Sequence, residues 1–231
     1  GYDRVVRRVV PAVGLRQILG THPGYQGIIA FRVQGSGLRG EKLKVVFLDR
    51  DGVINKYPGD RFYVTSLAKF KFLPGAKSAI VQLTEAGFKL FIASNQAGVG
   101  RGIYAERTLE AITAKMLSVI ERAGGKIDKV YYCIHRKDAG CLCRKPKPEL
   151  LKKAAKEFRF SLKNSYFIGD TIRDVITAEN ADCQSILVLS GKEKLANQKN
   201  WEAKPDLVFK NLKAAADFLC HVGTSTCLPA G

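Results

Sequence analysis

Two pairs of closely spaced acidic residues are the first feature of this sequence that suggests chemistry. Asp49 and Asp51 directly follow the apolar run 45–48, and Asp170 and Asp174 form a second pair far along the chain. Carboxylates suit a hard divalent cation such as Mg²⁺, and one of a pair can act as a nucleophile or a general acid. A single Asp in such a place is as often a turn former or a helix cap.

A second group of residues suits a different metal. Three thiols and one imidazole lie within eleven residues, and its members are Cys133, His135, Cys141 and Cys143. Four such ligands match a tetrahedral, closed Zn²⁺ site that leaves no open position for a substrate. We predict a structural zinc loop at 133–143; the alternative is a set of buried or surface thiols without a metal.

Polar residues at two further places could hold the oxygens of a phosphate. Ser94, Asn95 and Gln96 follow an apolar run, and Arg144 and Lys145 follow the predicted zinc loop. Hydroxyl, amide and cationic groups stabilise the charge that spreads over phosphoryl oxygens during transfer. These residues are therefore candidates for an oxyanion site.

The elements that must position these residues alternate along the chain. We expect strands at 45–48, 89–93, 129–133, 166–168, 185–189 and 207–209, and helices at 76–87, 105–123, 149–158, 172–180 and 211–219. This alternation predicts an α/β fold, a Rossmann-like three-layer sandwich with a mostly parallel central sheet. Because the carboxyl ends of parallel strands meet at one edge, the candidate residues should converge there.

The order of the motifs resembles that of the haloacid dehalogenase (HAD) superfamily of phosphohydrolases. The four motifs of that family match Asp49-x-Asp51, Ser94, Lys145, and Gly169-Asp170 with Asp174. The resemblance covers roughly 45–219 and implies a HAD-like fold and a Mg²⁺-dependent phosphatase that cleaves phosphate monoesters.

The resemblance also implies a role for each residue. Asp49 would attack phosphorus to form an aspartyl-phosphate, and Asp51 would act first as general acid and then as general base. Asp49, the backbone carbonyl of Asp51, and Asp170 would hold the Mg²⁺. Lys145 and Ser94 would stabilise the phosphoryl oxygens. A supporting role falls to Asp174, beside Lys145 or the metal.

Loop lengths limit what can cover the site. Neither the segment between Asp51 and Ser94 nor that between Asn95 and Lys145 has room for a separate cap domain. We expect a comparatively open site whose walls are the zinc loop and a flap at 57–60.

Within the superfamily, the sequence most resembles the branch that contains the D-glycero-D-manno-heptose 1,7-bisphosphate 7-phosphatases and the histidinol phosphatases. Both groups have a Cys-x-His and Cys-x-Cys loop before Arg-Lys-Pro. The stretch 94–102, the flap 57–60 and the turn 190–192 favour the heptose enzymes of carbohydrate metabolism and heptose biosynthesis. The five-residue spacer between His135 and Cys141 is instead similar to histidinol phosphatases.

The substrate expected from this resemblance is a small phosphorylated sugar. A second phosphate on the sugar presents an anion that Arg144 and Arg101 could clamp. The other substrate contacts that we expect are Tyr57, Asp60, Ser94, Asn95, Gln96 and Lys145.

Composition adds a preference for anionic partners. Lys and Arg number 38 against 21 Asp and Glu, a formal net charge of +17. A polynucleotide 3′-phosphatase and a zinc-stabilised nucleic-acid-binding module are therefore alternatives. We do not expect nucleic acid, because the Lys residues are scattered along helices rather than interleaved with aromatic residues. No apolar stretch approaches the roughly 20 residues of a membrane span.

The first forty residues differ in composition from the rest of the chain. They hold six Arg, no Lys and eight of the 22 Gly. We expect an Arg- and Gly-rich extension at 1–42 outside the fold, the phosphatase domain at 43–220, and a tail at 221–231. Without a recognisable export signal, and with cysteines grouped for metal, the expected setting is a monomer in the reducing cytoplasm.

Overall fold

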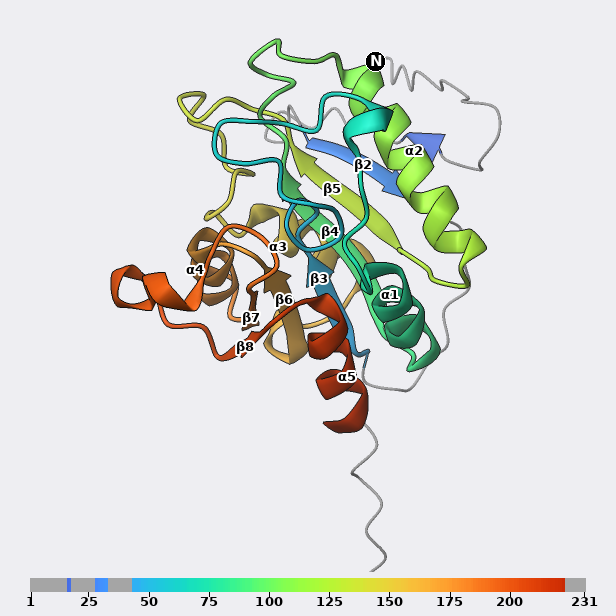
Figure 1. The fold of residues 1–231 in the computed structure, drawn as a ribbon, viewed down its shortest axis with the longest axis vertical. Coiled ribbons are helices and arrows are strands. Elements are labelled where there is room, and N and C mark those ends of the chain that lie inside the picture. Colours follow the sequence, from blue (N-terminus) through green and yellow to red (C-terminus); the bar gives the residue numbers. More distant parts are fainter. Residues whose placement is uncertain (1–15, 18–27, 33–42, 223–231) are drawn as a thin grey trace, which may run out of the picture.

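A computed structural model describes residues 16–17, 28–32 and 43–222 of the chain (Figure 1). From residue 43 onward, strands and helices alternate as the apolar pattern predicts. The strands are β3 (Val45–Leu48), β4 (Lys89–Asn95), β5 (Lys129–Cys133), β6 (Ser165–Gly169), β7 (Gln184–Val188) and β8 (Leu207–Phe209). The helices are α1 (Ala76–Glu85), α2 (Glu106–Arg122), α3 (Glu149–Phe158), α4 (Ile172–Asn180) and α5 (Leu212–Val222), with 3₁₀ turns η1 (Leu67–Lys69), η2 (Leu162–Asn164) and η3 (Leu195–Asn200).

Strands β3 to β8 form a parallel sheet. The order in the described sheet is β1-β2-β5-β4-β3-β6-β7-β8, which puts β3 between β4 and β6. Leu48 is level with Ile92 on one side and with Ile168 on the other. The residues that follow these three strands therefore emerge side by side at the carboxyl edge of the sheet.

Helices cover both faces of the sheet, which confirms the three-layer α/β prediction. Side chains alternate along β3, so Val46 and Leu48 join the hydrophobic cluster beneath α1, α2 and α5. Val45 and Phe47 join a second cluster beneath α3 and α4. All four side chains are almost completely buried. Strands covered on both faces read as continuous apolar runs rather than alternating ones.

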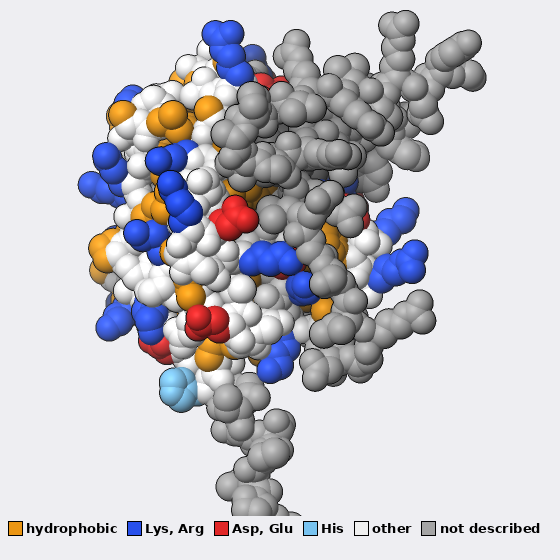
Figure 2. Space-filling view, turned by 90° about the vertical axis from the view of Figure 1, so that its right-hand side faces the viewer, with side chains coloured by type: hydrophobic (Ala, Val, Ile, Leu, Met, Phe, Trp, Pro, Cys, Tyr) orange, Lys and Arg blue, Asp and Glu red, His pale blue; other side chains and the backbone are white. Residues whose placement is uncertain are grey.

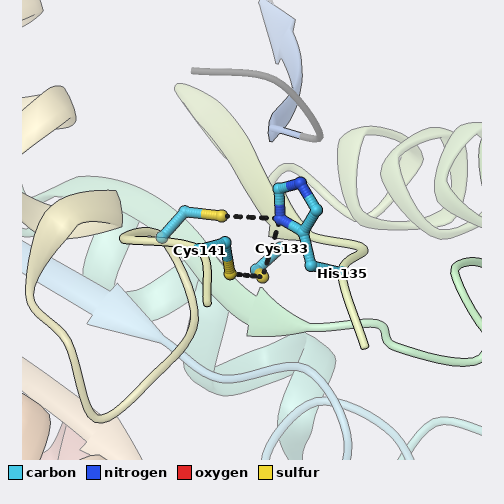
Figure 3. Close-up of side chains that lie close together, drawn as sticks. Cys133, His135 and Cys141 are labelled. Atoms are coloured by element: carbon cyan, nitrogen blue, oxygen red, sulfur yellow. Dashed lines mark hydrogen bonds between the residues drawn. The ribbon is translucent and has the colours of Figure 1, made fainter. Parts of the chain in front are cut away.

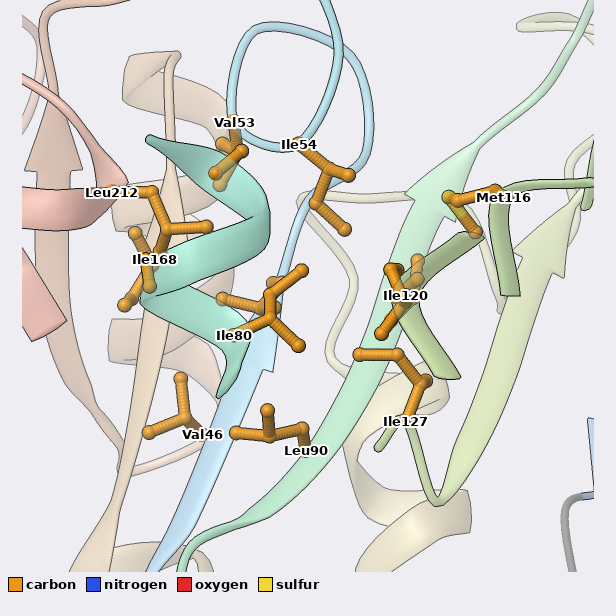
Figure 4. Close-up of a cluster of buried hydrophobic side chains, with 14 of the residues drawn as sticks. Val46, Val53, Ile54, Ile80, Leu90, Met116, Ile120, Ile127, Ile168 and Leu212 are labelled. Atoms are coloured by element: carbon orange, nitrogen blue, oxygen red, sulfur yellow. The ribbon is translucent and has the colours of Figure 1, made fainter. Parts of the chain in front are cut away.

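The two clusters differ in their chemistry. Figure 4 shows the first cluster, in which Ile80 of α1 and Ile120 of α2 pack among aliphatic side chains. The second is aromatic: the ring of Phe91 lies 4.8 Å from that of Phe158 and 5.6 Å from that of Phe160, centroid to centroid. Each fully buried side chain of this size contributes roughly 1.5–3 kcal/mol to folding. Both layers thus hold the central strands that carry the motifs.

Two short strands precede residue 43. β2 (Ile28–Arg32) pairs antiparallel with β5, and β1 (Arg16–Gln17) pairs with β2. This differs from the expectation that residues 1–42 lie outside the fold, because β5 would otherwise leave an open edge of the sheet that can accept another strand. The rest of 1–42 and the residues after 222 lie outside the described residues, so the expected domain boundaries stay predictions.

No separate cap domain interrupts the described residues 43–222. Between β3 and α1 the chain forms a loop that contains η1, and between β4 and α2 it forms a shorter loop. In the described part of the chain, no helix is both long and apolar enough to cross a membrane.

Candidate active site and metal centres

Three carboxylates from two strand ends meet at the carboxyl edge of the sheet. Asp49 follows β3, Asp170 follows β6, and Asp174 lies in the first turn of α4. An oxygen of each lies within 4.8 Å of those of the others, and all three residues are buried. The pairing of β3 with β6 is what brings them together. The two acidic pairs of the sequence thus form one cluster, which we call the acidic cluster.

Lys145 is the cation that faces the acidic cluster. Its Nζ lies 3.0 Å from Oδ2 of Asp49 and 2.6 Å from Oδ1 of Asp174. It also lies 5.1 Å from the centre of the Phe167 ring. Burial opposes a charge on Lys145, but the two carboxylates outweigh it and raise its pKa. Lys145 is therefore an ammonium ion that links the nucleophile candidate to the fourth motif.

Burial makes the charged form of two carboxylates in the acidic cluster unfavourable. Burial raises the pKa of Asp49, against the opposing effect of Lys145. Burial, followed by repulsion from Asp174 and Asp49, raises the pKa of Asp170 well above its usual value. The cluster thus holds three buried carboxylates next to one ammonium ion, that of Lys145. An all-oxygen donor set with excess negative charge fits a hard divalent cation such as Mg²⁺.

Two glycines shape the slot that holds Asp170. A Cβ atom at Gly52 or at Gly191 would lie 2.1 Å or 2.0 Å, respectively, from Oδ2 of Asp170. Gly52 also has a φ of +83°, which other residues rarely adopt. The backbone N–H of Lys192 donates a 2.8 Å hydrogen bond to the same oxygen. The turn after Asp51 and the turn after β7 therefore fix this carboxylate together.

Asp174 has both of its oxygens engaged. Oδ2 accepts hydrogen bonds from the backbone N–H of Thr171 at 3.1 Å and from its hydroxyl at 2.7 Å, the pattern of a helix capping box. Oδ1 faces the ammonium of Lys145. Asp174 thus starts α4 and contacts Lys145, and its supporting role in the site stays a prediction.

The carboxylate of Asp51 points toward hydrogen-bond donors. The guanidinium of Arg50, which is fully buried, contacts it through Nε at 3.2 Å and Nη2 at 3.0 Å. Nδ2 of Asn55 lies 2.8 Å from Oδ1, and Nε2 of Gln96 lies 3.0 Å from Oδ2. Asp51 therefore lies two residues from Asp49 in the chain but in a separate hydrogen-bond environment.

The residues after β4 bond to other candidate residues. The Asn95 side chain makes two hydrogen bonds with the backbone of Lys145. Its Nδ2 donates to the carbonyl oxygen at 3.2 Å, and its Oδ1 accepts from the N–H at 3.1 Å. Gln96 is buried and contacts Asp51 and Ser94. Ser94 is also buried and lowers the pKa of Asp49 by hydrogen bonding. Asn95 and Gln96 thus form hydrogen bonds with protein groups that surround the acidic cluster.

The four predicted zinc ligands lie together, and we call them the zinc cluster. Sγ of Cys133 lies 3.7 Å from Nδ1 of His135 and 3.7 Å from Sγ of Cys141, and Sγ of Cys143 lies 3.2 Å from the same Nδ1. Figure 3 shows the labelled side chains of Cys133, His135 and Cys141 turned toward one another. Sulfurs about 2.3 Å from a common tetrahedral centre are about 3.8 Å apart. The spacing therefore fits Zn²⁺.

The chemistry of the zinc cluster also fits a metal. Hydrogen bonding with Cys143 lowers the pKa of Cys133 to about 5, although burial acts against this. A thiol that ionises this easily provides the thiolate that binds zinc. All the ligand atoms of the cluster lie within 4.8 Å of one another.

Hydrogen bonds connect the zinc cluster to the acidic cluster. The loop between them continues directly from Cys143 into Arg144 and Lys145. Nη1 of Arg144 donates to the carbonyl of His135 at 3.2 Å, and Asn95 holds the backbone of Lys145. The shape of the zinc loop therefore determines where the Lys145 ammonium lies.

The remaining predicted substrate contacts lie on exposed or half-buried loops. The hydroxyl of Tyr57 donates to Asp60 at 2.6 Å, and Nζ of Lys192 lies 2.8 Å from the same carboxylate oxygen. Nη1 of Arg101, which is exposed, donates to the hydroxyl of Tyr63 at 3.2 Å. The flap 57–60 thus contacts the turn after β7, and Tyr63, three residues beyond it, contacts the loop after β4.

Sequence reasoning missed several residues of the site. Arg50 lies between the two Asp residues of the first motif, and a cation at that place is a signal that could have been used. Lys192 was placed in a turn but was given no role. Asn55 and Tyr104 have no sequence signal, because only the folded loops bring them to Asp51 and Gln96.

Basic side chains are spread over the described part of the face shown in Figure 2. Figure 2 shows Lys and Arg side chains scattered over the visible face among neutral and hydrophobic groups. They form no continuous stripe over the described residues of this view.

Comparison with known proteins agrees with the site. A family model described as HAD-hydrolase-like matches residues 142–215. D-glycero-beta-D-manno-heptose-1,7-bisphosphate 7-phosphatase of Pseudomonas putida is 38% identical over 174 residues, covering 75% of this chain and 98% of that protein. The alpha-anomer enzyme of Campylobacter jejuni is 39% identical over 177 residues, 77% of this chain and 96% of that protein.

A solved structure is similar in fold as well as in sequence. The crystal structure of D,D-heptose 1,7-bisphosphate phosphatase from Bordetella bronchiseptica, complexed with magnesium and phosphate, matches with a TM-score of 0.74 and 34% identity, covering 78% of this chain and 99% of that one. Together with the geometry of the acidic cluster, these matches identify the chain as a phosphatase. The chain belongs to the HAD-like hydrolases, in the family that includes the D-glycero-D-manno-heptose 1,7-bisphosphate 7-phosphatases.

Proposed function

We propose that the chain hydrolyses D-glycero-D-manno-heptose 1,7-bisphosphate at its C7 phosphate, with Mg²⁺ and through an aspartyl-phosphate on Asp49. The observation that carries this proposal is the position of Asp49. Its Oδ2 lies 3.0 Å from the Lys145 ammonium, within a buried cluster that includes Asp170. The relatives act on different anomers of the sugar, so the proposal covers both.

The donor set proposed for Mg²⁺ consists of Asp49, the backbone carbonyl of Asp51, and Asp170. When bound, the cation neutralises charge on the nucleophile and on the phosphate and polarises the phosphoryl group. The excess of buried carboxylates over cations supports this assignment. The related Bordetella bronchiseptica structure contains magnesium and phosphate.

Asp49 is the proposed nucleophile. Its Oδ1 accepts a 2.7 Å hydrogen bond from the backbone N–H of Arg50, which holds the carboxylate in one orientation. In the first step a carboxylate oxygen forms a bond to phosphorus while the bond from phosphorus to the C7 oxygen breaks. Lys145 and Ser94 stabilise the charge on the phosphoryl oxygens.

Asp51 is the proposed proton carrier. It gives its proton to the departing C7 alkoxide, and it then takes a proton from the water that attacks the aspartyl-phosphate. Inorganic phosphate leaves, and Asp49 and Asp51 return to their starting forms. The two residues lie on the same short loop after β3, which supports this division of work.

The zinc cluster has a structural role in this proposal. Four protein ligands close a tetrahedral Zn²⁺ site, so no position remains for the substrate. The cluster instead fixes the segment that carries Arg144 and Lys145. With Arg101, Arg144 is proposed to bind the second phosphate, and the flap residues Tyr57 and Asp60 contact the sugar. The expected contacts of Asn95 and Gln96 with substrate oxygens remain part of the proposal.

A panel of phosphate esters tests the proposed substrate. Phosphate release would be measured with and without Mg²⁺ on heptose 1,7-bisphosphate, fructose 1,6-bisphosphate, histidinol phosphate and a 3′-phosphorylated oligonucleotide. We expect kcat/KM for the heptose to exceed the others by at least about 10-fold and to require Mg²⁺. A higher value for histidinol phosphate, which the five-residue spacer of the zinc loop favours, or for the oligonucleotide would overturn the assignment.

The cellular setting is part of the proposal. The five described cysteines are free thiols, which agrees with a reducing cytoplasm. The oligomeric state that we propose is a monomer, as expected from the sequence. Sedimentation of the purified protein would test the monomer, and cell fractionation would test the location.

A further inference from the structure

The side chains of Gln96 and Tyr104 form a buried connection that the mechanism above does not use. Gln96 is 1% exposed and Tyr104 is 7% exposed. The Tyr104 hydroxyl lies 2.8 Å from Oε1 of Gln96. Nε2 of the same amide lies 3.0 Å from Oδ2 of Asp51 and 3.2 Å from Oγ of Ser94. One amide therefore contacts two residues of the proposed chemistry.

The hydrogen-bond partners determine which way this amide faces. An ionised carboxylate only accepts hydrogen bonds, and a proton on the other oxygen of Asp51 would leave Oδ2 an acceptor, so the NH₂ group of Gln96 faces Oδ2 in both forms. The amide oxygen then faces the hydroxyl of Tyr104, which can donate. Burial raises the pKa of Tyr104, so its hydroxyl keeps its proton. Both amide protons and the amide oxygen are thus used.

The same arrangement has a consequence for Ser94. Because Oγ of Ser94 accepts a hydrogen bond from Gln96, its own proton is available for an oxygen of Asp49 or of the phosphate. At Asp51, Gln96 contacts Oδ2, whereas Asn55 contacts Oδ1. Removal of the amide would take one donor from Ser94 and one from Oδ2 of Asp51, which would keep its 3.1 Å hydrogen bond from Nη2 of Arg50.

We propose that Gln96 is a positioning residue that orients Asp51 and Ser94 through one amide, and that Tyr104 fixes the orientation of Gln96. This inference rests on the proposed function and deepens it. It also assigns Gln96 a role through other residues, in addition to the substrate contact expected from the sequence.

Leaving groups of different basicity test the proposal. The variants are Gln96→Ala and Tyr104→Phe, each assayed on heptose 1,7-bisphosphate and on 4-nitrophenyl phosphate. An alkoxide needs a proton from Asp51 as it leaves, whereas 4-nitrophenolate is stable without one. General acid catalysis is worth about 10²–10⁴-fold, so we expect Gln96→Ala to lower kcat on the sugar by about 10²-fold.

The first step on the aryl ester should respond differently. We expect the rapid burst of 4-nitrophenol in Gln96→Ala to slow by no more than about 10-fold, the part that comes from Ser94, while KM stays within about threefold. Tyr104→Phe should show the same pattern with a loss of about 10-fold on the sugar, since it removes one hydrogen bond.

A matched control is Tyr131→Phe. Tyr131 is a fully buried tyrosine whose hydroxyl donates to Glu157 at 3.0 Å, and it belongs to the hydrophobic cluster on the α3 side of the sheet. This variant should keep kcat within about twofold on both esters.

The outcomes distinguish a failure of the positioning role from a failure of the proposed function. A burst on the aryl ester that slows as much as kcat on the sugar falls, or a loss confined to KM, would overturn the positioning role while the wild type remains an active phosphatase. A wild-type protein that hydrolyses neither ester would overturn the proposed function and, with it, this inference. Thermal unfolding of each variant, unchanged within about 3 °C, excludes a general loss of packing as the cause.

Discussion

The zinc cluster and the acidic cluster lie near the same edge of the sheet, but they are built in different ways. All four ligands of the zinc cluster come from residues 133–143, a single segment. The acidic cluster joins Asp49 to Asp170, which are far apart in the chain and meet only because β3 pairs with β6. A local segment can thus form a structural metal site, whereas the reactive site depends on the topology of the whole sheet.

The two clusters also differ in their electrostatics. The zinc cluster contains polarisable thiols that hydrogen-bond one another and His135. The acidic cluster holds three buried carboxylates, and burial, together with their mutual repulsion, raises the pKa values of Asp49 and Asp170 although Lys145 acts against this. Groups held in such a state are typical of sites that do chemistry rather than of sites that stabilise a fold.

The largest expected effect comes from Asp49→Asn in the acidic cluster. An amide cannot form the aspartyl-phosphate, so kcat should fall by at least about 10⁴-fold, while the fold persists. Phosphate release and circular dichroism would measure the two effects. Asp182→Asn, an exposed Asp whose φ of +55° suits Asn, is the control and should keep full activity. Substantial residual turnover in Asp49→Asn would reject the nucleophile assignment.

The next effect concerns the zinc cluster, through Cys143→Ser. Loss of one thiolate should remove zinc and lower the free energy of unfolding by about 3 kcal/mol or more. Because the loop continues into Lys145, kcat should also fall, by about 10²-fold. Metal content, thermal unfolding and kcat would be measured together. Cys183→Ser, a buried cysteine outside the cluster, should retain zinc; loss of zinc there, or full activity in Cys143→Ser, would contradict the comparison.

A smaller effect is expected for Asp170→Asn in Mg²⁺-free buffer. This substitution should raise the stability of the fold, whereas Cys143→Ser should lower it. The raised pKa of Asp170 means that the folded state holds its proton more tightly than the unfolded chain. Stability from this group is therefore complete below the unfolded pKa of about 4 and is lost as pH rises through the higher folded pKa. The Asn variant has no carboxylate to ionise at this position and does not lose this stability. It should therefore unfold at a higher temperature than the wild type, and the difference between the two unfolding temperatures should widen as pH rises.

The size of that gap and its response to Mg²⁺ are measurable. Relief of about 1 kcal/mol corresponds to roughly 2–4 °C in a domain of this size. Mg²⁺ should stabilise the wild type and leave Asp170→Asn unchanged, since a cation stabilises only a state that binds it. If Asp170→Asn is less stable than the wild type at pH 8 without Mg²⁺, the buried charge of Asp170 does not destabilise the acidic cluster.

The smallest effect is expected at the rim, outside both clusters. Arg101→Ala removes an exposed cation that contacts Tyr63. We expect KM for a sugar bisphosphate to rise about 3- to 10-fold, while KM for a monophosphate stays within about twofold. Steady-state kinetics on both substrates would measure this. An equal rise for both would place Arg101 at the reacting phosphate instead of at the second one.

Much of the fold could be predicted because its signals are local. Apolar runs buried on both faces mark the parallel strands, and β5, α3, α4 and β8 begin and end where the pattern places them. β4 and β6 extend further, to Asn95 and Gly169, because pairing with neighbours continues past the apolar run. The strand at 28–32 was missed, since nothing in its sequence shows that it pairs with β5.

The site residues also differ in whether the sequence alone reveals them. The residues of the zinc cluster are recognisable from spacing alone, and those of the acidic cluster from their order along the chain. The contacts of Asp51 are not, because Gln96 and Asn55 reach it from other turns of the fold. Residues that act through others need the folded structure to be found, which is why Tyr104 carried no signal in the sequence.

The most direct test of the central claim is to trap phosphate on Asp49. The enzyme would be mixed with Mg²⁺ and labelled sugar bisphosphate and quenched in acid within milliseconds, and its peptides would be analysed by mass spectrometry. We predict an acid-stable, hydroxylamine-sensitive phosphoryl group on the peptide that contains Asp49, absent from Asp49→Asn. Turnover without any phosphorylated enzyme, or a label on Ser94 instead, would contradict the account.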